Sequence, residues 1–144
     1  MAIGLFSKEE RNRIVEAIKV AELKTSGEIQ VHLERHCKGD VLDRAAEVFE
    51  MLKMHQTKKR NGVLFYLAVE DHKLAILGDI GINQTVPDDF WENIKNTMIK
   101  HFKEGEYTKG LTTGIKLAGE QLSQHFPFED VDNINELPDE ISFG

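Results

Sequence analysis

Carboxylates gather in the stretch LAILGDIGINQTVPDDFWENI, which begins like a strand and ends like a helix. Asp79 follows the apolar run, and Asp88 and Asp89 follow Pro87. A chain that only had to turn a corner could use Gly and Asn alone. Carboxylate oxygens are the ligands that Ca²⁺ and Mg²⁺ prefer. The stretch therefore suggests a site for a hard divalent cation.

A fourth carboxylate, Glu28, opens the run EIQVHLE. It precedes no expected helix, so capping does not explain it. The other three have simpler explanations: Asp88 or Asp89 could cap a helix and meet its dipole, and Asp79 could serve a turn. We keep those alternatives open, and we take Glu28, Asp79, Asp88 and Asp89 as the candidate metal ligands.

A second acidic group occurs elsewhere in the chain. Its His32-x3-His36-Cys37 spacing lacks a second pair of ligands, which disfavours zinc. Asp40 is expected to cap a helix and His72 to lie in an exposed turn. The sequence contains no glycine-rich phosphate loop, nucleophile elbow or Cys–His pair of a known spacing. The full group comprises Glu34, His36, Cys37, Asp40, Asp43, Glu70, Asp71 and His72.

Hydrophobic periodicity predicts the elements that must position these groups. Apolar residues recur at helical spacing in four segments, which we predict as helices over residues 7–24, 41–56, 88–104 and 107–125. Strands are predicted over residues 28–34, 63–69 and 74–77. The first strand alternates polar and apolar residues, which is typical of a strand with one buried face, and the second is apolar throughout.

This order of elements predicts a three-layer α/β/α sandwich with a mixed sheet. The first two strands, joined through a helix, should be parallel with a right-handed crossover, and the third should return as a hairpin. Glu28 and Asp79 would then lie at one edge of the sheet. The expected helix start at Asp88 and Asp89 would join them there.

Length and composition favour one domain. The chain has 144 residues, of which 40% are hydrophobic and 30% charged, enough for a core without disulfides. The net charge of −7 argues against nucleic acid as a partner. A single cysteine, an early charged N-terminus and the lack of a long apolar run predict a cytoplasmic protein with no membrane span.

The last residues change character. Residues 1–127 are predicted to form the domain, and residues 128–144 an acidic, aperiodic tail, loosely attached to it. The tail begins like an EF-hand loop, but Asn135 stands where Gly is required and Ile141 where the bidentate Glu belongs. The tail is therefore not an EF-hand.

Several weak motifs in order resemble the TPM domain. They are NGVL at the second strand, LAILGDIGI at the third, Phe90-Trp91, and Phe102-x-x-Gly105-x-Tyr107-x-x-Gly110-Leu111. The resemblance runs from about Phe6 to Pro127 and is to the short, stand-alone bacterial form. It implies an α/β/α sandwich with an acidic surface that binds a divalent cation. For some plant members it also implies acid phosphatase activity.

Two functions follow as hypotheses. In the first, Ca²⁺ or Mg²⁺ binds at the carboxylate edge and orders a surface that meets another protein. In the second, the metal serves a phosphomonoesterase, polarising phosphate and activating water. The second needs a basic phosphate clamp, for which residues 58–60 (Lys-Lys-Arg) are the candidates. The first is favoured because no nucleophile accompanies the carboxylates.

Overall fold

The computed structural model describes residues 6–128 and 139–144. It is a mixed α/β structure, as predicted. The elements run in the order α1 (Lys8–Glu22), β1 (Glu28–Glu34), α2 (Val41–Met51), the 3-10 turn η1 (Met54–Gln56), β2 (Gly62–Ala68), β3 (Lys73–Gly78), α3 (Ile80–Asn83), α4 (Glu92–Lys103), α5 (Tyr107–Leu122) and β4 (Ser142–Phe143).

The sheet has four strands in the order β3-β2-β1-β4. β1 and β2 are parallel, with Glu28 opposite Gly62, and β2 and β3 are antiparallel, with Val63 opposite Gly78. This confirms the crossover and the hairpin. β4 is an addition that the sequence did not predict, and it pairs in parallel with β1.

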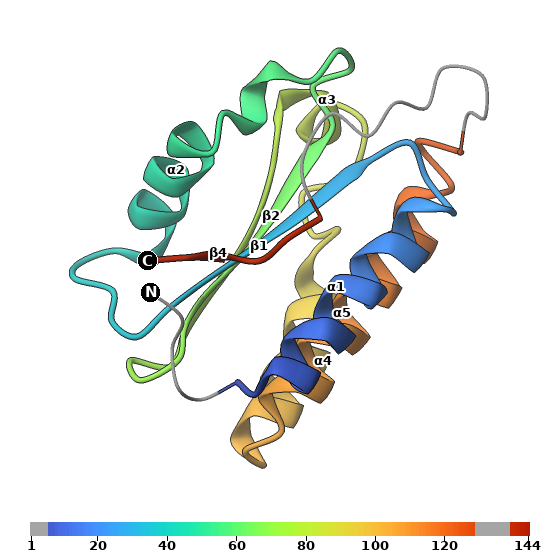
Figure 1. The fold of residues 1–144 in the computed structure, drawn as a ribbon. Helices are drawn as coiled ribbons and strands as arrows, with labels where there is room; N and C mark the ends of the chain where they lie inside the picture. Colours follow the sequence, from blue (N-terminus) through green and yellow to red (C-terminus); the bar gives the residue numbers. More distant parts are fainter. Residues whose placement is uncertain (1–5, 129–138) are drawn as a thin grey trace.

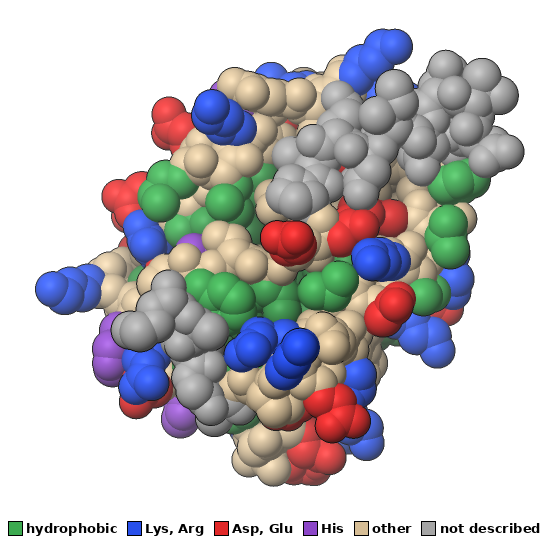
Figure 2. All heavy atoms as spheres, viewed as in Figure 1, with side chains coloured by type: hydrophobic (Ala, Val, Ile, Leu, Met, Phe, Trp, Pro, Cys, Tyr) green, Lys and Arg blue, Asp and Glu red, His purple; other side chains and the backbone are tan. Residues whose placement is uncertain are grey.

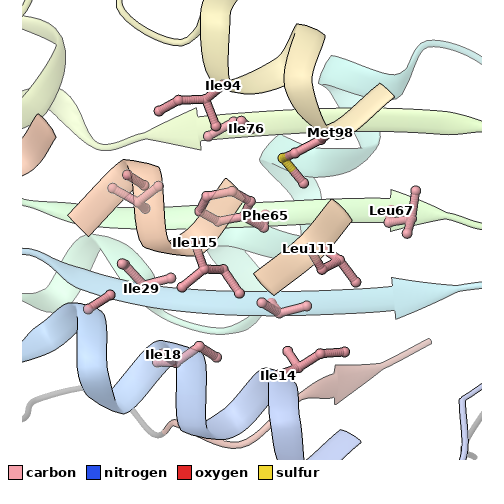
Figure 3. Close-up of a cluster of buried hydrophobic side chains, with 14 of the residues drawn as sticks. Ile14, Ile18, Ile29, Phe65, Leu67, Ile76, Ile94, Met98, Leu111 and Ile115 are labelled. Atoms are coloured by element: carbon pink, nitrogen blue, oxygen red, sulfur yellow. The ribbon is translucent and has the colours of Figure 1, made fainter. Parts of the chain in front are cut away.

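Helices cover both faces of the sheet, which makes the three predicted layers (Figure 1). α1, α4 and α5 lie on one face, and α2 lies on the other against β2 and β3. The larger core fills the three-helix side (Figure 3). Its labelled members are Ile14, Ile18, Ile29, Phe65, Leu67, Ile76, Ile94, Met98, Leu111 and Ile115.

Local chemistry explains where the first helices begin. Ser7 and Glu10 form a capping box, since each side chain accepts a hydrogen bond from the other's backbone amide. Asp40 caps α2 by accepting from the amide of Asp43, as predicted. No helix in the described part of the chain combines the length and the apolar character that a bilayer crossing would need.

Close contact between α4 and α5 depends on small residues. A Cβ at Gly114 would overlap the side chain of Met98, and one at Gly110 would overlap Phe102. The glycines lower helix propensity by about 1 kcal/mol each, but they let the two helices approach. Both glycines lie on the buried, apolar face of α5.

The predicted start of the third long helix at Asp88 is wrong. Residues 88–91 form turns, in which the Phe90 amide donates to the Pro87 carbonyl, and α4 begins at Glu92. No side chain caps its first turn. A separate short helix, α3, occupies residues that were predicted as loop, because the Asp79 carboxylate caps it at Ile80.

The last residues of the predicted tail contact the sheet and the core. Phe143 packs against the larger core, and β4 extends the sheet beside β1. Two backbone pairings suffice to dock this segment although it has no hydrophobic period. Residues 129–138, the rest of the predicted tail apart from Phe128, lie outside the described part of the chain.

Candidate metal site and a buried polar strand

Glu28 and Asp79 lie at the same end of the sheet, as the topology predicted. The Glu28 amide donates to the Asn61 carbonyl at 3.2 Å, and the Asp79 amide donates to the Gly62 carbonyl at 2.9 Å. β2 starts between them, however, so their backbones are two strand spacings apart, roughly 10 Å. The shared edge is confirmed, but the two residues flank β2 rather than meet.

Asp79 is occupied by other groups. Its carboxylate accepts hydrogen bonds from Nε and a terminal nitrogen of Arg60, at 2.7 and 2.9 Å. It also accepts a hydrogen bond from the Ile80 amide at 2.8 Å. Arg60 has a positive φ of 52°. Gly81 allows the Arg60 turn to approach, because a Cβ there would collide with the carbonyls of Lys59 and Arg60. The Arg60 guanidinium neutralises Asp79 in this arrangement.

Asp88 and Asp89 are exposed in the turn before α4. Neither caps the helix, so the capping explanation for these two residues does not apply. Neither belongs to a compact group of ligand atoms among the described residues. Of the four predicted ligands, Glu28 and Asp79 share an edge, and nothing places Asp88 or Asp89 with them.

The carboxylate neighbours of Glu28 come instead from α1 and from the C-terminal segment. Glu22 accepts the Ile29 amide at 2.9 Å. Burial raises the pKa of Glu22 to about 9, with further contributions from a hydrogen bond to Asp139 and from the charges of Asp139 and Glu28. Glu22 therefore holds a proton at neutral pH. Sequence reasoning missed Glu22 because it ends a helix whose apolar stripe gives it no special position.

β1 buries both of its faces, which corrects the expectation of one buried face. The apolar residues Ile29, Val31 and Leu33 enter the larger core. The alternate residues point to the α2 side, yet they too are buried, with exposed fractions of 5, 2, 3 and 5% for Glu28, Gln30, His32 and Glu34. We call these four residues the polar row.

Glu34 anchors the far end of the polar row. Arg44 of α2 donates to both of its oxygens at 2.9 Å, and the Tyr66 hydroxyl and a ring nitrogen of His32 also contact it. Burial opposes ionisation, but hydrogen bonds from Arg44, Tyr66 and His32 lower the pKa of Glu34 to about 2. Burial lowers the pKa of His32. Glu34 is thus a charged, satisfied structural group.

The middle of the row is less satisfied. His32 Nδ1 lies 2.9 Å from the Ser142 hydroxyl of β4. Gln30, between Glu28 and His32, has a side-chain oxygen that is buried and has no hydrogen-bond partner. An unsatisfied buried oxygen is unfavourable, and a bound water or ion is one way to satisfy it. The unpartnered Gln30 oxygen lies on the same face of β1 as Glu28, the preceding member of the polar row.

The opposite end of the sheet holds the second acidic group. Asp71 receives His36 Nδ1 at 3.0 Å and the Cys37 amide at 2.6 Å. The His36 hydrogen bond, followed by that from Cys37, lowers the pKa of Asp71. His72 is exposed at a positive φ of 54° in the hairpin turn, as predicted. These contacts connect the β2–β3 hairpin to the segment that follows β1.

One compact group of potential ligand atoms exists among the described residues. His101, Glu104 and Glu106, at the junction of α4 and α5, each bring one ligand atom within 4.8 Å of the others. His101 Nδ1 is buried without a hydrogen-bond partner, 3.7 Å from a Glu106 oxygen. Both glutamates are exposed. This group is a second candidate, which the sequence analysis did not identify.

Together these features define a class of protein. It is a three-layer domain in which a central parallel strand carries buried polar groups, with carboxylates gathered at one end of the sheet. Figure 2 shows acidic side chains near the centre of the face that carries β4. The chain belongs to the TPM domain family, which it matches over residues 2–121. That membership confirms the resemblance seen in the sequence motifs.

Solved structures agree with this assignment. The chain is similar to the BA42 protein of the psychrophilic bacterium Bizionia argentinensis, with 50% identity, a TM-score of 0.91, and 96% of this chain and 95% of that chain covered. Two more distant likenesses show the fold alone. The N-terminal domain of a P. gingivalis protein has 23% identity and a TM-score of 0.67, with 85% of this chain and 78% of that chain covered. The N-terminal domain of cg2496 from Corynebacterium glutamicum has 15% identity and a TM-score of 0.65, with 82% of this chain and 74% of that chain covered. No curated protein matches the chain.

Proposed function

We propose that this TPM domain is a divalent-cation-binding module that uses its metal to order a surface for another protein. The proposed ion is Ca²⁺ or Mg²⁺, because the available ligands are oxygens. The proposed site is centred on Glu28, one of the four ligands that the sequence predicted, and its neighbours are Glu22 and Asp139 in place of Asp79, Asp88 and Asp89. Gln30 would contribute its side-chain oxygen.

One observation carries the proposal. In the polar row the Gln30 side-chain oxygen has no hydrogen-bond partner, and the carboxyl groups of Glu22, Glu28 and Asp139 lie near this end of the row. Glu22 holds its proton because burial and the nearby acids make its charged form unfavourable. A divalent cation would supply the missing positive charge and release that proton. It would also give the unpartnered Gln30 oxygen a partner.

Asp139 links the proposed site to a surface. It precedes β4, whose two residues pair with β1. A cation shared between Glu28 and Asp139 would fasten this segment to the sheet and fix the face on which it lies. That is how metal binding would prepare a surface for a partner, which is the interaction role proposed here.

The phosphatase alternative has weaker support. A phosphomonoesterase would need a cationic clamp beside the metal, and Arg60 was one of the candidates in residues 58–60. Its guanidinium is paired with Asp79 at 2.7 Å. A phosphate would have to displace that carboxylate. We therefore favour the module and retain phosphatase activity as an outcome to be tested.

Thermal unfolding with and without Ca²⁺ or Mg²⁺ tests the proposal. Binding to the folded state alone would add about 2.7 kcal/mol to the free energy of unfolding at a hundredfold excess over Kd. Glu28→Gln should remove most of this gain. Asp88→Asn, which changes an exposed carboxylate in the turn before α4, should retain the gain.

Two further variants separate the competing sites. Asp79→Asn tests the ligand set expected from the sequence, and Glu104→Gln with Glu106→Gln tests the group at the α4–α5 junction. If only the latter pair removes the metal response, the Glu28 site is refuted. Phosphate release from p-nitrophenyl phosphate by the same metal-loaded sample, lost in Glu28→Gln, would establish the enzymatic alternative.

A further inference from the structure

A cleft of about 780 Å³ lies at the opposite end of the sheet from Glu28, between the β2–β3 hairpin and the α4–α5 junction. Figure 1 shows the hairpin and this junction at the same lower end of the molecule. The volume lies within the range of small-molecule sites. Its apolar walls are formed by Val41, Leu67, Leu74, Ile99, Phe102 and Tyr107.

The charge of this cleft is opposite to that of the chain. Its lining includes Lys73, Lys95, Lys103 and His72, and none of its lining residues is acidic. The chain as a whole has 25 acidic residues and 18 basic ones, a net charge of −7. A local excess of lysine beside apolar walls therefore marks a site that would attract an anion.

The lysines differ in how they are held. Lys73 donates to the carbonyls of Cys37 and Gly39 at 2.9 and 2.8 Å, which fixes its ammonium group at the wall. The side-chain ammonium groups of Lys95 and Lys103 form no ion pair or hydrogen bond within the described part of the chain. Their charges are available to a ligand without breaking an existing pair.

An ordered aromatic pair gives the cleft its shape. Phe102 and Tyr107 stack with ring centroids 5.2 Å apart and an angle of 22° between the ring planes. Leu67 and Leu74 are directly paired across β2 and β3, so they form a rigid apolar floor. Rigid walls of this kind are preorganised and bind an apolar group with a small entropic cost.

We propose that this cleft binds a small amphipathic carboxylate, with its hydrocarbon body between the aromatic and aliphatic walls and its carboxylate at Lys95 and Lys103. The charge complementarity favours an anion over a neutral ligand, and the concave apolar walls favour a hydrocarbon body over a free inorganic anion. This site is separate from the proposed cation site, so the two proposals stand or fall independently.

Calorimetric titration with dodecanoate, below its micelle concentration, tests the proposal, with 1-dodecanol as the uncharged probe of equal chain length. Dodecanoate should bind about tenfold more tightly than dodecanol, as expected for one to two partly exposed charge contacts. The double variant Lys95→Gln, Lys103→Gln should remove that difference. Lys100→Gln, an exposed lysine of α4 outside the cleft, should bind like the unsubstituted protein.

Ile99→Trp adds a test that leaves every charge in place. The larger side chain should fill the cleft and abolish binding of both probes, while circular dichroism verifies that the variant is folded. The proposal is overturned if dodecanoate does not bind, if it binds no better than dodecanol, or if Lys100→Gln weakens it as much as the double variant. Binding that survives in a folded Ile99→Trp variant would also place the ligand elsewhere.

Discussion

Glu22 is a residue whose protonation should make the stability of the whole domain depend on pH. Its pKa rises from the ordinary 4.5 to about 9 on folding, chiefly through burial. Between these values the folded state binds a proton that the unfolded state has lost. The stabilisation is therefore complete below pH 4.5 and is lost as the pH rises towards 9.

Glu22→Gln should stabilise the metal-free protein at pH 7, by up to about 3 kcal/mol. The amide imitates the protonated carboxyl and needs no proton. Denaturant unfolding between pH 5 and pH 9 measures the effect, and the variant should show a flatter profile. Glu16→Gln, an exposed residue of the same helix, is the control. Equal pH profiles for Glu22→Gln and the unsubstituted protein would contradict a raised pKa.

Glu34 should behave in the opposite way. Its pKa falls from the ordinary 4.5 to about 2 despite burial, because Arg44, Tyr66 and His32 donate hydrogen bonds to it. Its stabilisation is present above pH 4.5 and is lost as the pH falls towards 2. Glu34→Gln should cost about 2–3 kcal/mol at pH 7, since Arg44 would remain partly buried without its partner.

Glu47→Gln provides the matched control for this prediction. Glu47 pairs with the same guanidinium at 2.8 Å, but its side chain is 66% exposed. An exposed pair contributes little, about 0.5 kcal/mol. Urea unfolding of the two variants measures the difference. A similar loss in both would mean that burial of the Glu34 pair has no special role.

At the scale of elements, the contact between α4 and α5 depends on the absence of a side chain at Gly114. Gly114→Ala should destabilise the domain by about 1–3 kcal/mol, because overlap with Met98 outweighs the gain in helix propensity. Lys116→Ala, at an exposed position of the same helix, should change the stability little. A stabilised Gly114→Ala variant in thermal unfolding would show that Met98 can move aside.

β4 lies within the segment that the sequence predicted as a tail, and it pairs with β1. Phe143 packs against the larger core, so Phe143→Ala should cost about 1–2 kcal/mol. It should also speed the hydrogen exchange of the Gly144 amide, which donates to the Leu33 carbonyl at 3.0 Å. Glu140→Ala, at an exposed position nearby, is the control. An unchanged melting temperature for Phe143→Ala would show that this contact contributes little to stability, as expected for a loosely attached tail.

The sequence predicted the regular elements well and the irregular ones poorly, for physical reasons. The segments with a clear pattern were predicted well: α1 has apolar residues at helical spacing, and β2 is a short, continuous apolar run. α3 and β4 have four and two residues, too short for any period to appear. The start of α4 was misplaced because Pro87 and two aspartates are equally suited to a turn and to a helix N-terminus.

The candidate site was predicted in part. Strand directions alone placed Glu28 and Asp79 at one end of the sheet, and the register confirms it. No sequence pattern indicated that Arg60 would pair with Asp79, since that contact depends on the left-handed backbone conformation of Arg60. Nor could alternation in β1 show that its polar face is buried, because the covering groups come from distant parts of the chain.

For the whole molecule, the two ends of the sheet have different chemistry. Glu22, Glu28 and the unpartnered Gln30 oxygen lie where β1 begins, whereas the end where β2 finishes holds both the second acidic group and the lysine-lined cleft. The 50% identity to BA42 extends over almost the full length of both chains. A cation at one end and an organic anion at the other is the arrangement we propose for this domain.

The central claim is that a divalent cation binds at the Glu28 end of β1, and residue-resolved NMR during a Ca²⁺ titration tests it most directly. We expect saturable shifts of the Glu22, Glu28, Gln30 and Asp139 amides, with proton release at pH 7 as Glu22 ionises. The same resonances should stay still in Glu28→Gln. Shifts confined to residues 101–106, or no shift at all, would contradict cation binding at Glu28.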